Sequence, residues 1–247
     1  YWGSPGQPAG GGGRRERGLL SCRQQGVAGV RYLSSDPTTT RLPEKIRQGR
    51  LPLVVVSPSL MEEECNLVMR DNRQAASLAT RYLIDRGHRS IAYIGGGESD
   101  RIRQQRLLGF TGALKQYGLL SRDELTPLCG GGTHAAAHAT RPLLESNNTI
   151  TALPCHSPDA LFGCIRGIHQ TGRTVGKDIF LSQQVALVGF EDLLHVNLTS
   201  PSLTCVSSAS EEHGRQAVSL MIRKLKDPGL QSQRITLSGE LVIRESA

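Results

Sequence analysis

The sequence contains no apolar run that approaches the roughly 20 residues a helix needs to cross a bilayer. Its content of 38% hydrophobic and 21% charged residues is ordinary for a globular protein. With 247 residues, the chain is long enough for one large α/β domain or for two smaller lobes. It begins with Tyr1, and no charged segment followed by an apolar stretch indicates a secretory leader. We therefore expect a globular protein without a transmembrane helix.

Metal-binding and disulfide patterns are also missing. The six cysteines are scattered without a Cys-x-x-Cys pair, which indicates neither a zinc site nor a disulfide framework. His134 and His138 stand four residues apart on one predicted helical face, but no third ligand accompanies them, so solvated side chains are the favoured interpretation. We predict reduced cysteines, a cytoplasmic location and no metal.

The motifs of phosphate binding and nucleophilic catalysis are incomplete. The glycine loop at residues 95–97 follows a predicted strand, but neither a complete Gly-x-Gly-x-x-Gly nor a Gly-Lys-Ser/Thr sequence is present. No Gly-x-Ser-x-Gly elbow occurs, and no paired carboxylates indicate another chemistry. The sequence therefore predicts a protein that is not an enzyme and that uses no cofactor.

Positive charge is concentrated in the first fifty residues. They hold nine Lys or Arg against three acidic residues, so +6 of the net +7 lies there and +1 remains for the other 197 residues. The nearly neutral body argues against direct DNA binding by that body. Residues 1–24 are rich in Gly and Arg without aliphatic periodicity, and we interpret them as a disordered or aberrant segment. A basic RNA-binding tail is the less favoured alternative because no aromatic residue is interleaved with the arginines.

Strand and helix patterns alternate from residue 53 onward. The spacing of apolar residues, with Gly at helix ends, predicts strands at 53–56, 90–94, 125–128, 151–155, 184–189, 202–206 and 235–243, and helices at 72–86, 101–117, 134–145, 158–170 and 210–226. This alternation predicts an α/β fold with a largely parallel sheet that helices cover on both faces.

Residues 185–192 form the most informative candidate site, because four apolar residues run into the turn Gly-Phe-Glu-Asp. In open α/β sheets ligands bind outside the carboxyl ends of the strands, so an aromatic ring and carboxylates at that position suit a polar small molecule. A buried strand followed by a solvated acidic turn is the alternative, and the octapeptide taken alone favours it.

Further motifs stand in a fixed order around this strand. They are Asp71-Asn72, Gly-His-Arg-Ser-Ile-Ala-Tyr-Ile-Gly at 87–95, Arg-Leu-Leu-Gly-Phe at 106–110, Val-Gly-Phe-Glu-Asp at 188–192, Pro-Ser-Leu-Thr at 201–204 and Leu-Val-Ile-Arg-Glu-Ser at 241–246. Together they resemble the effector-binding core of lac repressor family transcriptional regulators, over about residues 50–247. Residues 182–185, Asp71-Asn72 and Ser57 resemble most the maltose regulon repressor branch.

The resemblance implies a type I periplasmic-binding-protein-like fold with two α/β lobes, a small effector in the cleft and a homodimer. It places the amino-terminal lobe at residues 25–95 plus about 207–230 and the carboxy-terminal lobe at 96–206 plus about 231–247. The first lobe is expected to be incomplete. A helix-turn-helix head would bind operator DNA in such proteins, and we find no such head before residue 53.

The resemblance also implies five effector-binding residues. Ser57 falls at a strand end that contacts effector, and Arg106 falls where a guanidinium reaches ligand oxygens. A solvated arginine on a helix surface is the alternative for Arg106. Glu191 occupies the position of an aspartate that accepts hydrogen bonds from sugar hydroxyls, and Phe190 is expected against a sugar face. Ser157 stands where the family often has Asn, so the usual amide contact is in doubt.

The predicted function is the effector-binding and dimerisation core of a sugar-responsive transcriptional repressor, with a sugar or sugar phosphate as effector. A solute-binding protein of a sugar transporter, which shares the fold, is the alternative. The motif Gln-Gly-Val-Ala-Gly-Val at residues 25–30 resembles a family strand, but the elements expected before it are replaced by the Gly- and Arg-rich stretch. A shifted reading frame or truncated gene model upstream of Gln25 is our hypothesis, which resequencing of the encoding DNA tests.

Overall fold

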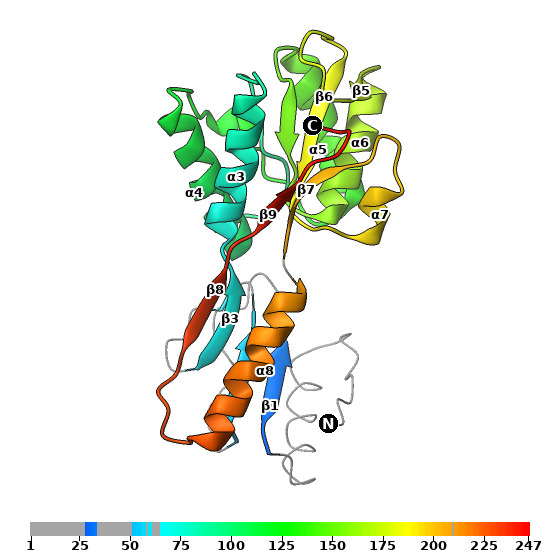
Figure 1. Ribbon diagram of the computed structural model, residues 1–247. Helices are drawn as coiled ribbons and strands as arrows, with labels where there is room; N and C mark the ends of the chain where they lie inside the picture. The colour runs from blue at the N-terminus through cyan, green and yellow to red at the C-terminus, as the bar shows by residue number, and fades with distance from the viewer. Residues whose placement is uncertain (1–27, 34–50, 58, 61–64, 209) are drawn as a thin grey trace. The chain divides into compact units, whose positions relative to one another are not determined.

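The structure, a computed structural model, describes residues 28–33, 51–57, 59–60, 65–208 and 210–247 (Figure 1). These residues form two compact units. The first unit contains the described residues before Arg70 together with Glu211–Thr236, and the second contains Arg70–Ser210 and Leu237–Ala247. The Gly- and Arg-rich segment 1–24 and the first part of the motif at 25–30 lie outside the described residues.

A four-stranded sheet with the order β1-β2-β3-β8 forms the centre of the first unit. Its strands are β1 (Val30–Leu33), β2 (Leu53–Val56), β3 (Asn66–Arg70) and β8 (Arg234–Leu237), and the pairs β1–β2 and β2–β3 are parallel. Helix α8 (Ser210–Lys226) belongs to the same unit and buries Ala217 and Leu220. The core includes Val55 and Leu67, and their neighbours Val54 and Val68 are also fully buried, as expected for parallel strands covered on both faces.

The second unit contains a sheet with the order β4-β6-β7-β9, with β5 paired to β6. The strands are β4 (Ala152–Pro154), β5 (Thr174–Val175), β6 (Gln184–Gly189), β7 (Thr204–Ser207) and β9 (Glu240–Val242). All pairs are parallel except β7–β9. Residues 91–94 run beside β4, with parallel bridges at Ile91 and Ile94.

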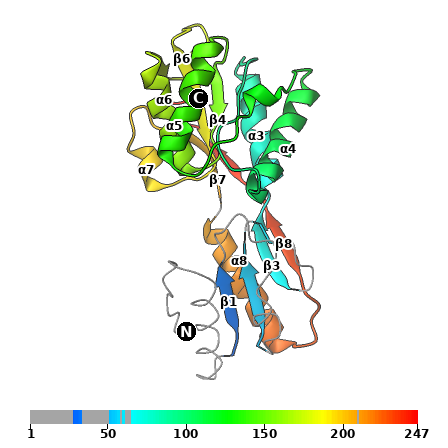
Figure 2. The same ribbon diagram turned by 180° about the vertical axis from the view of Figure 1, so that it is seen from behind.

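Helices cover this second sheet on both faces (Figures 1 and 2). One apolar cluster lies under α3 (Asn72–Asp85) and α4 (Arg101–Gln116), and another lies under α5 (Thr133–Ser146) and α6 (Pro158–Gln170). The short elements η1 (Asp123–Leu125) and α7 (Leu194–Asn197) lie in the connections. The prediction of an α/β fold with helix-covered parallel strands is confirmed.

The sequence patterns located all five long helices within two residues, and β2, β6, α6 and α8 have the predicted bounds. The strand predicted at 125–128 does not form, and the strand region predicted at 235–243 is divided into β8 and β9, which belong to different sheets. The segment predicted as a strand at 90–94 forms only two isolated bridges. Pro154 explains this difference, because it has no N–H to donate to the Ala92 carbonyl oxygen. The flanking hydrogen bonds are present, from Ala92 N to Ala152 O at 3.1 Å and from His156 N to Ile94 O at 2.8 Å.

The division into units differs from the expected lobes, because residues 70–95 belong to the second unit. Helix α3 packs closely on α4, where a Cβ added to Gly109 would lie 2.1 Å from the Arg73 carbonyl oxygen. Residues 91–94 pair with β4 of the second unit. The chain passes between units after Met69, Ser210 and Thr236 rather than near residues 95, 206 and 230.

No helix in the described ranges is long and apolar enough to cross a membrane. The five cysteines in this part of the chain are free thiols, and four of them are buried.

Candidate functional site

The carboxyl ends of parallel strands meet at one edge of the second sheet. Residues 91–94, β4 and β6 run in the same direction, so the residues that follow them, Gly95, His156 and Phe190, are brought to this edge. Helix α4 begins shortly after Gly95 and extends its first two turns over the same region. The topology therefore assembles a site from three segments that are far apart in the sequence.

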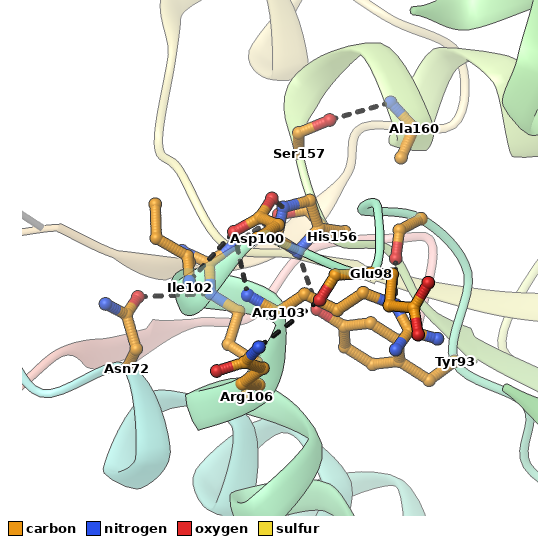
Figure 3. A network of polar contacts seen from close by, with 12 residues as sticks. Asn72, Tyr93, Glu98, Asp100, Ile102, Arg103, Arg106, His156, Ser157 and Ala160 are labelled. Carbon is orange, nitrogen blue, oxygen red and sulfur yellow. Dashed lines mark hydrogen bonds and ion pairs between the residues drawn. The ribbon is translucent and has the colours of Figure 1, made fainter. Parts of the chain in front are cut away.

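Arg106 on α4 belongs to a network of polar contacts that also includes Asn72, Asp100 and His156 (Figure 3). Its side chain is buried, its Nε donates to Asn72 Oδ1 at 3.2 Å, and its Nη1 donates to the His156 carbonyl oxygen. The guanidinium carbon lies 4.4 Å from the centre of the Phe190 ring, which is a cation–π distance. Burial lowers the pKa of Arg106, while Tyr93, Glu191 and Asp100 oppose this shift. The alternative of a solvated surface arginine is therefore wrong.

His156 is held between two side chains. Its Nε2 lies 2.8 Å from Asp100 Oδ2, and its Nδ1 lies 2.8 Å from the Tyr93 hydroxyl. Burial lowers the pKa of His156, although Asp100 opposes this effect. Burial acts to raise the pKa of Asp100, but hydrogen bonds from His156 and from the backbone N–H of Arg103 outweigh it and hold the pKa below its ordinary value. The neutral ring thus donates from Nε2 to the carboxylate and accepts the Tyr93 proton at Nδ1.

Asp100 also fixes the start of α4. Its Oδ1 accepts hydrogen bonds from the backbone N–H groups of Ile102 at 2.8 Å and Arg103 at 3.0 Å, which makes it the N-cap. Arg103 is buried and donates to the carbonyl oxygens of Gly95 at 3.0 Å and Thr126 at 2.7 Å. These contacts hold the helix that carries Arg106 in a fixed position relative to the strand ends.

The structure brings four of the five predicted residues to this edge of the second unit. Arg106 and Phe190 are in direct contact, whereas Ser157 caps α6 by accepting a hydrogen bond from Ala160 N at 3.2 Å. Phe190 is only 1% exposed, and its ring lies against the Arg106 guanidinium. The ring therefore has no exposed face for the predicted contact with a sugar. Ser57 belongs to the first unit, where its Oγ accepts a hydrogen bond from Leu60 N at 3.2 Å.

Glu191 differs from the other site residues because it is partly exposed and its carboxylate has no hydrogen bond or ion pair with any described residue. It lies close enough to Arg106 and Arg70 to affect the pKa of both. The next acid, Asp192, instead accepts a hydrogen bond from Arg244 at 2.6 Å. Glu191 is therefore the acid at this strand end whose oxygens are available to a ligand.

Five residues of this region were not predicted from the sequence as site residues: Asn72, Tyr93, Asp100, His156 and Arg70. Asp100 carries a signal that could have been used, because an Asp directly before a predicted helix is a favoured N-cap. Asn72 was noted only as part of a motif, and nothing local distinguishes Tyr93 or Arg70 from other buried residues. Among the described residues, no group of three or more His, Cys, Asp or Glu side chains could hold a metal ion.

The comparison with protein families decides the classification. The family described as periplasmic binding proteins and sugar binding domain of LacI family matches residues 9–244. The chain belongs to this family. The sequence-based identification of a LacI-family effector-binding core and of the type I periplasmic-binding-protein-like fold is confirmed.

Relatives of the chain include two bacterial regulatory proteins. The chain is 28% identical over 221 residues to the maltose regulon regulatory protein MalI of Escherichia coli (strain K12), covering 88% of this chain and 65% of MalI. It is 26% identical to the ribose operon repressor of the same strain, covering 95% of this chain and 69% of the repressor. The chain thus spans about two thirds of the length of these relatives.

Among solved structures, the transcriptional regulator CelR in complex with cellobiose is similar. The two share 27% identity and a TM-score of 0.79, with 96% of this chain and 71% of CelR covered. A regulatory protein of LacI family from Chloroflexus aggregans gives a TM-score of 0.80 at 25% identity, covering 93% of this chain and 79% of that protein.

Proposed function

We propose that the chain is the effector-binding and dimerisation core of a sugar-responsive transcriptional repressor, which binds a small sugar through Arg106 and Glu191. Operator binding would belong to a helix-turn-helix head outside this chain. The names of the relatives support this proposal, because they include the ribose operon repressor and a regulator in complex with cellobiose. We further propose that the protein acts in the cytoplasm as a homodimer.

The observation that carries the proposal is the carboxylate of Glu191, which has no hydrogen bond or ion pair with the described residues and lies close enough to Arg106 to affect its pKa. Arg106 is held by Asn72, the His156 carbonyl and the Phe190 ring, so it loses little side-chain entropy when a ligand binds. A carboxylate that none of the described residues bonds can accept hydrogen bonds from the hydroxyl groups of a ligand. Carbohydrates present such hydroxyl groups in pairs.

A solute-binding protein of a sugar transporter is the alternative function. It would use the same fold, and the family description covers both classes. The regulators MalI, ribose operon repressor and AscG among the relatives favour the repressor.

Catalysis is not part of the proposal. The His156–Asp100 pair is the arrangement that most resembles a general base. However, the second ring nitrogen of His156 is hydrogen-bonded to the Tyr93 hydroxyl, and His156 and Tyr93 are both buried. Burial raises the pKa of Tyr93, so this hydroxyl is a poor nucleophile at neutral pH.

Calorimetric titration with sugars tests the proposal. Ribose, glucose, maltose and cellobiose are first screened by thermal shift, and the sugar with the largest shift is titrated. We expect Glu191→Gln to weaken binding about tenfold or more, because a hydrogen bond to a charged group contributes roughly 1.5–3 kcal/mol. Arg106→Lys should weaken it similarly, since Lys cannot reproduce the guanidinium fork.

Glu240→Gln is the matched control, because Glu240 is an exposed glutamate of the same unit on β9. It should bind like the unmodified chain. If Glu191→Gln and Arg106→Lys both bind the sugar with unchanged affinity, Glu191 and Arg106 are not the binding site. If the unmodified chain binds none of the four sugars, the proposed sugar effector is wrong.

A further inference from the structure

Arg70 is a buried arginine at the start of the second unit for which the sequence gives no role. It ends β3 and is 7% exposed. Its Nη1 donates to the Phe190 carbonyl oxygen, and its Nη2 donates to the Val206 carbonyl oxygen at 2.9 Å. The guanidinium therefore joins the carboxyl-terminal parts of two neighbouring strand segments.

The Arg70 contacts lie directly beyond the last paired residues of β6 and β7. The strands pair at Val188 with Thr204 and at Gly189 with Cys205, and the next pair along would be Phe190 with Val206. The Arg70 guanidinium bonds to the carbonyls of that next pair. It thus extends the connection of the two strands by one residue, up to the peptide bond that precedes Glu191.

Arg70 also lies beside the second-unit ends of the three connecting segments. It is the first residue of the second unit after the chain leaves Met69. Val206, to which it donates, lies four residues before the passage after Ser210. Gly239 follows the third passage, and a Cβ added there would lie 3.6 Å from Arg70 Nη2. One guanidinium therefore contacts or adjoins all three segments within the second unit.

The surroundings do not satisfy Arg70 completely. Its Nε is buried and has no hydrogen-bond partner among the described residues. Burial and the nearby Arg106 lower the pKa of Arg70 to about 9, and Glu191 opposes this shift. A buried cation with an unsatisfied donor costs stability compared with a well-packed apolar side chain. Stability alone is therefore a weak explanation for an arginine at this position.

We propose that Arg70 is a positioning residue of the effector site, which orients Glu191 through the Phe190 carbonyl and ties that strand end to the three connecting segments. The proposal rests on the proposed function. An effector bound at Glu191 would then restrict the backbone at residues 207–208 and 237–239, because one guanidinium bonds to the Phe190 and Val206 carbonyls and adjoins Gly239.

Arg173 provides a matched control at the opposite edge of the same sheet. Its Nη2 donates to the Ile150 carbonyl at 2.9 Å and to the Gln184 carbonyl at 3.3 Å, and its Nε and Nη1 are buried and have no hydrogen-bond partner in the part of the chain that the structure describes. Ile150 precedes β4, and Gln184 begins β6. Arg173 therefore repeats the chemistry of Arg70, a guanidinium between two strands, at the ends that are remote from Glu191.

The experiment compares Arg70→Met with Arg173→Met in the full chain, titrated with whichever of ribose, glucose, maltose and cellobiose binds the unmodified chain. Both variants are expected to lower Tm, because each substitution leaves two backbone carbonyl oxygens without the guanidinium donor. Arg70→Met should weaken sugar binding at least tenfold, whereas Arg173→Met should stay within twofold. Equal effects of the two variants on affinity would overturn the proposal and leave the proposed function intact; absence of sugar binding by the unmodified chain would overturn both.

A double-mutant cycle separates positioning from general loosening. If Arg70 acts through Glu191, Arg70→Met should change affinity less than twofold when Glu191→Gln is already present. Full additivity would contradict the proposal. Where either Met variant fails to fold, Arg70→Lys and Arg173→Lys replace the pair, because Lys retains one donor and the charge.

Hydrogen exchange provides the readout for the connecting segments. In the unmodified chain, sugar should slow amide exchange at residues 207–208 and 237–239. This protection should disappear in Arg70→Met and persist in Arg173→Met, each measured at sugar concentrations that give equal occupancy. Persistence in both variants would contradict the link to the segments.

Discussion

Helices approach their neighbours differently in the two units. In the second unit, glycines bring two backbones together: a Cβ at Gly109 would lie 2.1 Å from Arg73 O, and a Cβ at Gly163 would lie 2.4 Å from Thr133 O. In the first unit, a Cβ at Gly29 would lie 2.6 Å from Met221 Sδ, which is near the end of a flexible side chain. A side chain at Gly109 or Gly163 in the second unit would therefore meet backbone atoms that cannot move aside. A side chain at Gly29 in the first unit would first meet the flexible Met221 side chain, which can rotate away.

The largest expected effect is that of Gly109→Ala. The new methyl group would overlap a backbone oxygen, so α3 and α4 must separate, and we expect a loss of about 3 kcal/mol in the free energy of unfolding of the second unit, measured by urea titration. Gly112→Ala on the same helix is the control, because no atom lies within 4 Å of its added Cβ. It should stabilise α4 by about 0.5–1 kcal/mol. Equal stabilities of the two variants would contradict the rigid contact.

A pH dependence of stability is expected next, and it concerns the second unit. Burial, with a smaller effect of Arg89, lowers the pKa of His88 from 6.5 to about 4, while Nδ1 lies 2.8 Å from Thr151 Oγ1. Between pH 6.5 and about 4 the unfolded chain binds a proton that the folded chain does not, so stability falls as pH falls, by up to about 3 kcal/mol.

His88→Gln tests this dependence in urea titrations at pH 7 and pH 4.5. The variant should lose part of the difference between the two pH values, because Gln does not titrate. His134→Gln, on an exposed part of α5, is the control and should keep the difference. A pH difference that His88→Gln leaves unchanged would show that other groups cause it.

The first unit should tolerate the corresponding glycine change better. Gly29→Ala is expected to cost about 1 kcal/mol, because the Met221 side chain can rotate away from the new methyl group and the nearest backbone atom, the Pro52 carbonyl oxygen, lies 3.3 Å from the added Cβ. Met221→Ala in the same chain should relieve the overlap, so the two changes should not be additive. A loss for Gly29→Ala as large as that for Gly109→Ala would remove the distinction between the units.

The smallest effects are expected at surface ion pairs, which should not distinguish the units. Glu211 pairs with Arg215 on α8 of the first unit, and Glu145 pairs with Arg141 on α5 of the second, both at 2.8 Å and both exposed. Glu211→Gln and Glu145→Gln should each change the free energy of unfolding by less than about 0.5 kcal/mol. A change above 1 kcal/mol at Glu145 would contradict this expectation, and one at Glu211 alone would show coupling to the second ion pair of Arg215, with Glu212 at 2.8 Å.

Much of the fold could be predicted from the sequence. The bounds of α6 and α8 follow from apolar spacing and end signals that act within a few residues. The order of motifs also identified the family. The predicted boundary between the lobes, near residue 95, differs from the observed boundary after Met69. The observed boundary depends on the packing of α3 against α4 and on the pairing of residues 91–94 with β4, and no local sequence pattern contains these contacts.

The candidate site shows the same limit. The sequence by itself determined that an apolar strand ends at Phe190 and Glu191 and that α4 carries Arg106, because strand and helix periodicity are local properties of the chain. Only the tertiary structure decided that Arg106 covers Phe190, that His156 bridges Tyr93 and Asp100, and that Arg70 reaches the Phe190 carbonyl. These contacts join residues 56 to 120 positions apart, and they exist because parallel strands place their carboxyl ends at one edge.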